Sequence, residues 1–130
     1  MKQMIYKPDR EIDVLEEGTY KGYDYVIVSY GTHPCAYVEM PKDSPYFGLE
    51  YSELEDVIHC HGGLTYSGEL DHIYENDHRW FMGWDYAHAG DYAGYDILFN
   101  YSSREKDKKW TTEEIHEEVL NVIDQLKGVA

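Results

Sequence analysis

The sequence is short of positive charge and of long apolar runs, and both shortages narrow the function classes open to it. Eleven basic residues stand against 26 acidic ones, so the formal net charge is −15. This charge repels nucleic acid and anionic membranes unless basic groups gather locally. Tyr, Asp or Glu interrupts each of the longest apolar runs, which excludes a transmembrane helix. We therefore expect no direct nucleic-acid binding and no membrane association.

Cysteine is scarce too, and the first residues do not resemble an export signal. The N-terminal MKQMIYKPDREID lacks the apolar core of a signal peptide. We expect Cys35 and Cys60 to be reduced thiols in a cytoplasmic protein. No stretch of the 130 residues resembles an interdomain linker, which predicts one domain spanning residues 1–130.

Tyrosine, by contrast, is abundant, with 14 residues in the chain. Solubility alone explains an acidic surface. A second interpretation is that an acidic, Tyr-rich surface copies the charge of a nucleic acid and occupies a basic partner. Tyrosine is also favoured at binding sites, because its ring is apolar and its hydroxyl is polar.

The residue pattern predicts several strands followed by a helix. We expect strands at residues 23–30, 35–40, 64–67 and 79–87, the first in a hairpin that turns at Lys21-Gly22. Gly83, inside the last of these strands, indicates a bulge or a close backbone approach. Ser52 and Glu55 fit a capping box for a short helical segment at residues 52–57.

The C-terminal segment has the clearest helical pattern. Thr111 and Glu114 form a capping box, and Gly128 is the expected end of the helix. Apolar residues recur at helical spacing, namely Ile115, Val119, Val122, Ile123 and Leu126. The predicted fold class is therefore α+β, with a mostly antiparallel sheet and a packed C-terminal helix.

A first dense stretch of polar chemistry is HCHGGLTYSG, residues 59–68. Adjacent Gly62 and Gly63 allow successive N–H groups to face one concavity, and such nests bind anions. Nearby hydroxyls come from Thr65, Tyr66 and Ser67. His59 and His61 would project from one face of an extended segment, which suits a metal, acid/base chemistry or a phosphate. The alternative is a tight turn whose histidines hydrogen-bond the backbone.

A second dense stretch is RWFMGWDYAHAGDYAG, residues 79–94. Strand alternation places Arg79, Phe81 and Gly83 on one face, and Trp80, Met82 and Trp84 on the other, where one face supplies core. A bulge at Gly83 would move Asp85 and Tyr86 toward a pocket. Asp85, His88 and Asp91 are spaced by three, as metal ligands or acid/base groups at a strand end would be. Together the two stretches hold donors for an anion and flat rings for a base, so we expect them to form one pocket.

Three segments carry a resemblance to a known family: YKGYDYVIV, HCHGGLTYSG and WFMGWDYAHAGD. Over roughly residues 20–95 the chain resembles a family of small, acidic, uncharacterised proteins encoded by phages and prophages. The resemblance implies a phage counter-defence protein acting in the host cytoplasm. By analogy, such a protein sequesters or cleaves a nucleotide immune signal, such as a cyclic nucleotide or an ADP-ribose derivative.

The leading hypothesis is a binder of a small nucleotide signal, with hydrolysis left open. Its ligand-binding residues are Gly62, Gly63, Thr65, Tyr66, Ser67, Arg79, Trp80, Trp84 and Tyr86. If there is chemistry, His61 and His88 are the acid/base candidates, and Asp85 orients one of them. The second hypothesis is an acidic inhibitor that mimics nucleic acid and binds a basic host defence protein.

The third hypothesis is a metal-dependent hydrolase. Its candidate ligands are His59, His61, Asp85, His88 and Asp91. No cofactor is identified by the residues, and the oligomeric state, including a homo-oligomer, stays open.

Overall fold

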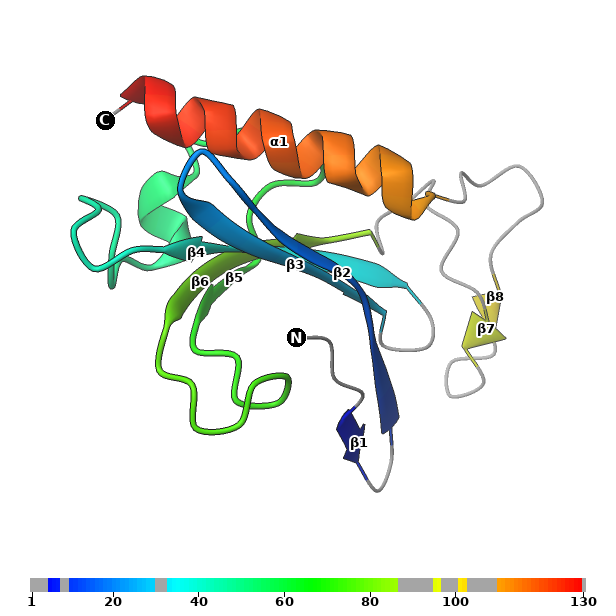
Figure 1. Cartoon of the computed structure of the whole chain (residues 1–130). Helices are drawn as coiled ribbons and strands as arrows, with labels where there is room; N and C mark the ends of the chain where they lie inside the picture. The colour runs from blue at the N-terminus through cyan, green and yellow to red at the C-terminus, as the bar shows by residue number, and fades with distance from the viewer. Residues whose placement is uncertain are drawn as a thin grey trace.

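The sheet and the C-terminal helix form an α+β fold, as predicted (Figure 1). The computed structural model describes residues 5–7, 10–29, 33–86, 95–96, 101–102 and 110–129. Six strands pair in the order β1-β2-β3-β4-β6-β5, and each of these pairings is antiparallel. They are β1 Ile5–Lys7, β2 Arg10–Tyr20, β3 Tyr23–Ser29, β4 Pro34–Met40, β5 Tyr66–Gly68 and β6 Trp80–Asp85.

Four further elements complete the described chain. A 3-10 helix, η1, spans Tyr51–Leu54, and the short strands β7 (Tyr95–Asp96) and β8 (Tyr101–Ser102) pair with each other. The α-helix α1 spans Thr112–Val129 and lies across one face of the sheet (Figure 1).

The hairpin β2–β3 forms as its turn residues predict. Lys21 and Gly22 both have positive φ, 51° and 88°, which is the backbone of a tight hairpin turn. Tyr20 and Tyr23 face each other on either side of it. Strand β3 is central and buried on both faces, because Tyr25 and Ile27 face the helix while Val26 and Val28 face the other side.

Helix α1 closes the larger core of the domain. The five predicted core residues of the helix, Ile115, Val119, Val122, Ile123 and Leu126, are all buried against the sheet. The predicted capping box is confirmed, because the Thr111 hydroxyl accepts from the Glu114 N–H at 3.1 Å and the Glu114 carboxylate accepts from the Thr111 N–H at 3.0 Å. The helix passes through Gly128 and ends at Val129, one residue beyond the expected stop.

The opposite face of the sheet is also buried, although only one face of the strand from Arg79 was expected to supply core. Its cluster contains Ile12, Val26, Val28, Cys35, Tyr37, Leu70, Ile73 and Phe81. The segment between β5 and β6, residues 69–79, supplies Leu70 and Ile73 and covers this face. The alternation predicted for β6 is correct, with Phe81 on this side and Met82 and Trp84 under the helix.

Gly83 marks a close approach of the Tyr37 ring to the backbone. Tyr37 on β4 and Tyr66 on β5 both pair with Gly83, and their rings meet edge to face at 5.5 Å. A Cβ at Gly83 would lie 2.7 Å from Cε1 of Tyr37 and 2.9 Å from the Ala36 carbonyl oxygen. The register of β4 with β6 is continuous, so the bulge considered for Gly83 does not form.

Two local predictions were wrong by a few residues. The short helical segment is η1, and its box joins Glu50 and Glu53 rather than Ser52 and Glu55. The strand expected at residues 64–67 begins at Tyr66. Leu64 instead lies before β5 and is a buried core side chain.

Leu126 offers a test of helix packing with a matched control on the same helix. Leu126→Ala removes a fully buried side chain and should lower the free energy of unfolding by about 2–5 kcal/mol in urea denaturation. Leu120→Ala, on the half-exposed side of α1, should cost less than about 1 kcal/mol. Equal losses at both positions would show that α1 does not pack as described.

Gly83 gives a second test, in which one substitution has opposite effects at two sites. Gly83→Ala should destabilise the protein by about 2–4 kcal/mol, because the added methyl group overlaps Tyr37 and backbone. Gly128→Ala, in a helix and with open space around it, should be neutral or stabilising by up to about 1 kcal/mol. Thermal unfolding of the two variants distinguishes these signs, and a tolerated Gly83→Ala would contradict the close approach.

Candidate functional site

The two dense stretches lie side by side, as expected. Strand β5 pairs with β6, and the Thr65 N–H donates to the Gly83 carbonyl at 2.9 Å. The Thr65 hydroxyl donates to the Asp85 carboxylate at 3.2 Å. The His61 ring stacks on the Tyr86 ring, with centroids 4.8 Å apart and planes 8° from parallel.

Trp110, which directly precedes the cap of α1, completes a group of three rings at this junction. Its centroid lies 4.9 Å from that of His61 and 5.2 Å from that of Tyr86, and it is tilted by 58° and 54° to them. We call His61, Tyr86 and Trp110 the ring cluster. Tyr86 is buried and its hydroxyl accepts from the Trp84 indole N–H at 3.0 Å, whereas His61 and Trp110 are partly exposed.

Helix α1 holds the first dense stretch in place through two side chains. The Glu118 carboxylate accepts from the His61 N–H at 3.0 Å. Gln125 accepts from the His59 N–H at 2.7 Å and donates to the His59 carbonyl at 2.6 Å. Glu118 and Gln125 are seven residues apart, about two helical turns, so both reach the same segment from one side of the helix.

The glycine pair forms a turn in which the Gly63 N–H is used inside the protein. Gly62 and Gly63 have φ values of 70° and 85°, and the Gly63 N–H donates to the Cys60 carbonyl at 2.9 Å. Glu118 already places a carboxylate on the His61 N–H. This geometry fits the tight-turn alternative better than a phosphate nest, because an anion here would lie beside Glu118.

The neighbouring hydroxyls turn to other partners. Tyr66 donates to the Glu69 carbonyl. Ser67 donates to the Glu50 carboxylate at 3.0 Å and accepts from the Tyr51 N–H at 3.1 Å. Both side chains therefore stabilise the 50–52 and 66–69 segments, whereas the Thr65 hydroxyl contacts the second stretch.

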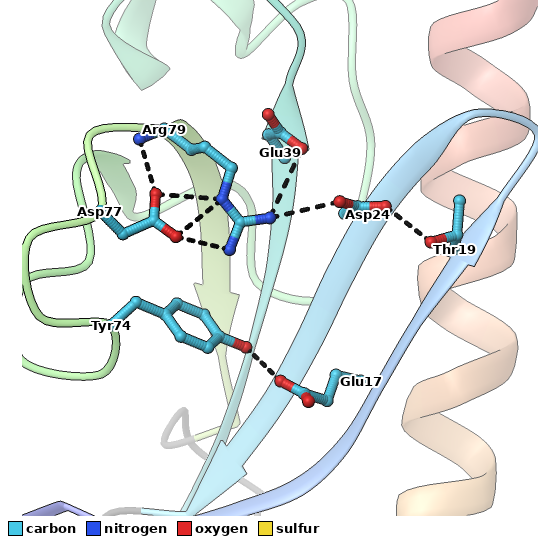
Figure 2. A network of polar contacts seen from close by, with 7 residues as sticks. All are labelled: Glu17, Thr19, Asp24, Glu39, Tyr74, Asp77 and Arg79. Carbon is cyan, nitrogen blue, oxygen red and sulfur yellow. Dashed lines mark hydrogen bonds and ion pairs between the residues drawn. The ribbon is translucent and has the colours of Figure 1, made fainter. Parts of the chain in front are cut away.

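Arg79 lies on the opposite face of the sheet from the ring cluster, in a network of carboxylates (Figure 2). Its Nε donates to both Asp77 oxygens at 3.0 and 2.9 Å, and its Nη2 lies 2.7 Å from Asp77. Its Nη1 lies 3.2 Å from Asp24 and 3.7 Å from Glu39. The guanidinium also sits 5.2 Å above the Tyr74 ring and 5.1 Å above the Phe81 ring.

The expectation that Arg79 joins the glycine pair in a phosphate site is thus corrected. Its cation is surrounded by three carboxylates, and it faces the cluster of Phe81 rather than that of Trp84. Hydrogen bonding to Arg79 lowers the pKa of Asp77, whereas burial raises the pKa of Glu39. Arg79 therefore serves to hold this face of the fold together.

The same network ties the loop before β6 to the β2–β3 hairpin (Figure 2). Asp24 also accepts from the Thr19 hydroxyl at 2.6 Å, and Glu17 accepts from the Tyr74 hydroxyl at 2.5 Å. A pocket of about 470 Å³ lies here, lined by Glu17, Gly18, Thr19, Asp24, Tyr25, Tyr74 and Arg79.

Two of the three rings predicted to stack on a base are core residues. Trp84 is 1% exposed and Tyr86 is 0% exposed, so neither offers a face to a ligand. Trp80 is partly exposed, but it lies at the other end of β6, where its indole N–H donates to the Leu49 carbonyl at 3.0 Å. The core needs these large rings to fill the space beneath α1.

Part of the predicted catalytic and metal set lies outside the described residues, namely His88 and Asp91. Among the residues that are described, no three or more potential ligands converge into a group that could hold a metal ion. His59, His61 and Asp85 do not form such a group there. Cys60 is no thiolate nucleophile at neutral pH, because burial raises the pKa of its thiol to about 12.

A shallow groove of about 650 Å³ runs beside the ring cluster over the outer side of α1. We call it the α1 groove. Its lining comprises Tyr20, His61, Tyr86, Trp110, Glu114, Glu117, Glu118, Leu120, Asn121 and Asp124. Lys21, on the hairpin turn, donates to Asp124 at 2.8 Å. Among the described lining residues there is no lysine or arginine, so the groove is acidic.

Sequence reasoning missed the helical side of this groove. Trp110 stands outside both dense stretches. Glu114 and Glu118 are four residues apart and therefore share one side of the helix. This spacing could have predicted an acidic side of the helix. A second polar contact under the helix, in which Glu16 accepts from Tyr25 at 2.6 Å and pairs with His116 at 2.6 Å, was also missed.

A comparison of the chain with protein-family models, curated proteins and solved structures finds no match in any of the three. Within the part of the chain that the structure describes, no helix is both long enough and apolar enough to cross a membrane. The contacts and charges of the α1 groove therefore carry the functional conclusion.

The Arg79 network makes stability depend on pH in a direction that can be measured. Asp77→Asn should lower the free energy of unfolding by about 1 kcal/mol at neutral pH. Because the folded-state pKa of Asp77 is lowered, its contribution is present above the unfolded pKa and is lost as the pH falls through the folded pKa. The difference from wild type should therefore shrink below about pH 4.

Urea denaturation near neutral pH and near pH 3 measures this effect. Asp71→Asn is the matched control, since Asp71 is an exposed aspartate of the same segment. That variant should differ from wild type by less than about 0.5 kcal/mol at both pH values. If the variant Asp77→Asn differs from wild type by the same free energy of unfolding at both pH values, the pairing with Arg79 does not contribute to stability.

Proposed function

We propose that the protein binds a basic partner protein through the acidic outer face of α1. The observation that carries this proposal is the α1 groove itself, which combines carboxylates with partly exposed aromatic rings and has no lysine or arginine among its described lining residues. Glu114, Glu117 and Glu118 of the helix line the groove with Asp124, which pairs with Lys21, and Glu113 is exposed on the same helix.

Electrostatics favours a cationic partner over an anionic one. A phosphate ligand in the groove would meet Glu114, Glu117 and Glu118, and Arg79 lies on the other face of the sheet. A surface of one sign accelerates the encounter with a partner of the other sign, and this acceleration falls with ionic strength. The net charge of −15 acts in the same direction over a longer range.

This proposal keeps one part of the acidic-inhibitor hypothesis, the binding of a basic protein. Binding and hydrolysis of a nucleotide signal are less well supported, because the donors expected for the phosphate either bond within the protein or lie on separate faces. The phage family, the host defence target and mimicry of nucleic acid stay predictions. A partner whose own surface binds nucleic acid is the kind of basic protein that this mimicry would require.

Two pairs of charge variants test whether the helix face, rather than the net charge, does the binding. Glu113→Gln/Glu117→Gln removes two exposed charges from α1, and Glu55→Gln/Asp56→Asn removes two exposed charges after η1. Each change moves the net charge from −15 to −13, since two negative charges are lost. The probe is a fluorescent lysine- and arginine-rich peptide, and fluorescence anisotropy reports its Kd at about 50 mM and about 200 mM salt.

The α1 variant should bind the peptide about threefold to tenfold more weakly than wild type at the lower salt, with a smaller difference at the higher salt. The control variant should bind within about twofold of wild type. Equal weakening in both variants would mean that net charge alone attracts the peptide, and the proposed binding face would then be wrong.

A further inference from the structure

The ring cluster and the carboxylates beside it are fixed in position, which a solvated acidic face does not require. Trp110 packs against both His61 and the buried Tyr86. The Glu114 carboxylate is held at the cap of α1 by Thr111, at 3.0 Å from its N–H. The Glu118 carboxylate is held at 3.0 Å from the His61 N–H. A partly exposed indole thus lies in one groove with two anchored carboxylates.

From this combination we infer that the α1 groove recognises arginine side chains of the basic partner, with Trp110 as the stacking surface. The inference rests on the proposed function and names the chemistry that this site selects. A guanidinium is planar, so it can stack its face on an aromatic ring while its edge donates to a carboxylate. A lysine ammonium is a compact point charge and cannot make both contacts in this way.

The protein's own Arg79 shows the same recognition elsewhere in the fold. Its guanidinium lies over the rings of Tyr74 and Phe81 and bonds the Asp77 carboxylate through Nε and Nη2 (Figure 2). The α1 groove offers the corresponding elements, an indole and carboxylates, without a described arginine or lysine in its lining. Charge complementarity and ring chemistry therefore favour an arginine-rich segment as its occupant.

The test compares an arginine-rich and a lysine-rich peptide of equal length and charge, with anisotropy as the measurement. Wild type should bind the arginine peptide about twofold to fivefold more tightly. Trp110→Leu should remove this preference while keeping salt-dependent binding of both peptides. Trp80→Leu is the matched control, because Trp80 is also partly exposed but lies at the other end of β6, and it should retain the preference.

A second variant keeps the test decisive if Trp110→Leu unfolds, which circular dichroism would detect. Glu118→Gln retains an oxygen that can accept from the His61 N–H but removes the charge. It should weaken binding of the arginine peptide more than binding of the lysine peptide. Loss of charge alone would weaken both equally, and that result would overturn the inference.

The outcomes separate this inference from the proposed function. Equal affinity of wild type for the two peptides, or a preference that survives in folded Trp110→Leu or in Glu118→Gln, overturns arginine recognition. The proposed function stands in that case if Glu113→Gln/Glu117→Gln still weakens binding more than its control. Failure of wild type to bind either peptide at low salt overturns the proposed function, and the inference with it.

Discussion

The packing of α1 on the sheet is the interaction on which the rest of the structure depends. Its apolar side closes the core over β3, β4 and β6, and the buried rings of Trp84 and Tyr86 fill the space beneath it. The same helix then anchors the 59–63 turn through Glu118 and Gln125. The helix therefore defines both the hydrophobic core and one wall of the α1 groove, so stability and the binding surface share one element.

Carboxylates are accommodated in different ways on the two faces of the sheet. On the helix side, carboxylates stand on the solvent side of α1 and are mostly hydrated, so their mutual repulsion is weakened by water and salt. On the other side, Asp24, Glu39 and Asp77 approach each other because Arg79 lies between them. One arginine allows three carboxylates to share a partly buried place, which explains why Arg79 is structural in a chain with so few cations.

Much of the fold could be predicted because it depends on local pattern. The hairpin turn at Lys21-Gly22, the buried strand β3 and the capped helix α1 follow from backbone preference and apolar spacing. The site could be predicted less well, because strand alternation says which side of β6 Arg79 takes but not what covers that side. The 69–79 segment and the hairpin supply those partners from distant parts of the chain. Likewise, Trp110 acquires its place only when α1 docks beside His61.

The packing at Gly83 makes substitutions at Tyr37, Tyr66 and Gly83 depend on one another. The space above Gly83 is occupied by the Tyr37 ring, and the Tyr66 ring rests against Tyr37 edge to face. A larger residue at position 83 requires a smaller ring on β4, and a smaller ring on β4 leaves Tyr66 without its neighbour. Descendants of this sequence should therefore change these three residues together or keep all of them, and covariation among the three would be a signature of this sheet.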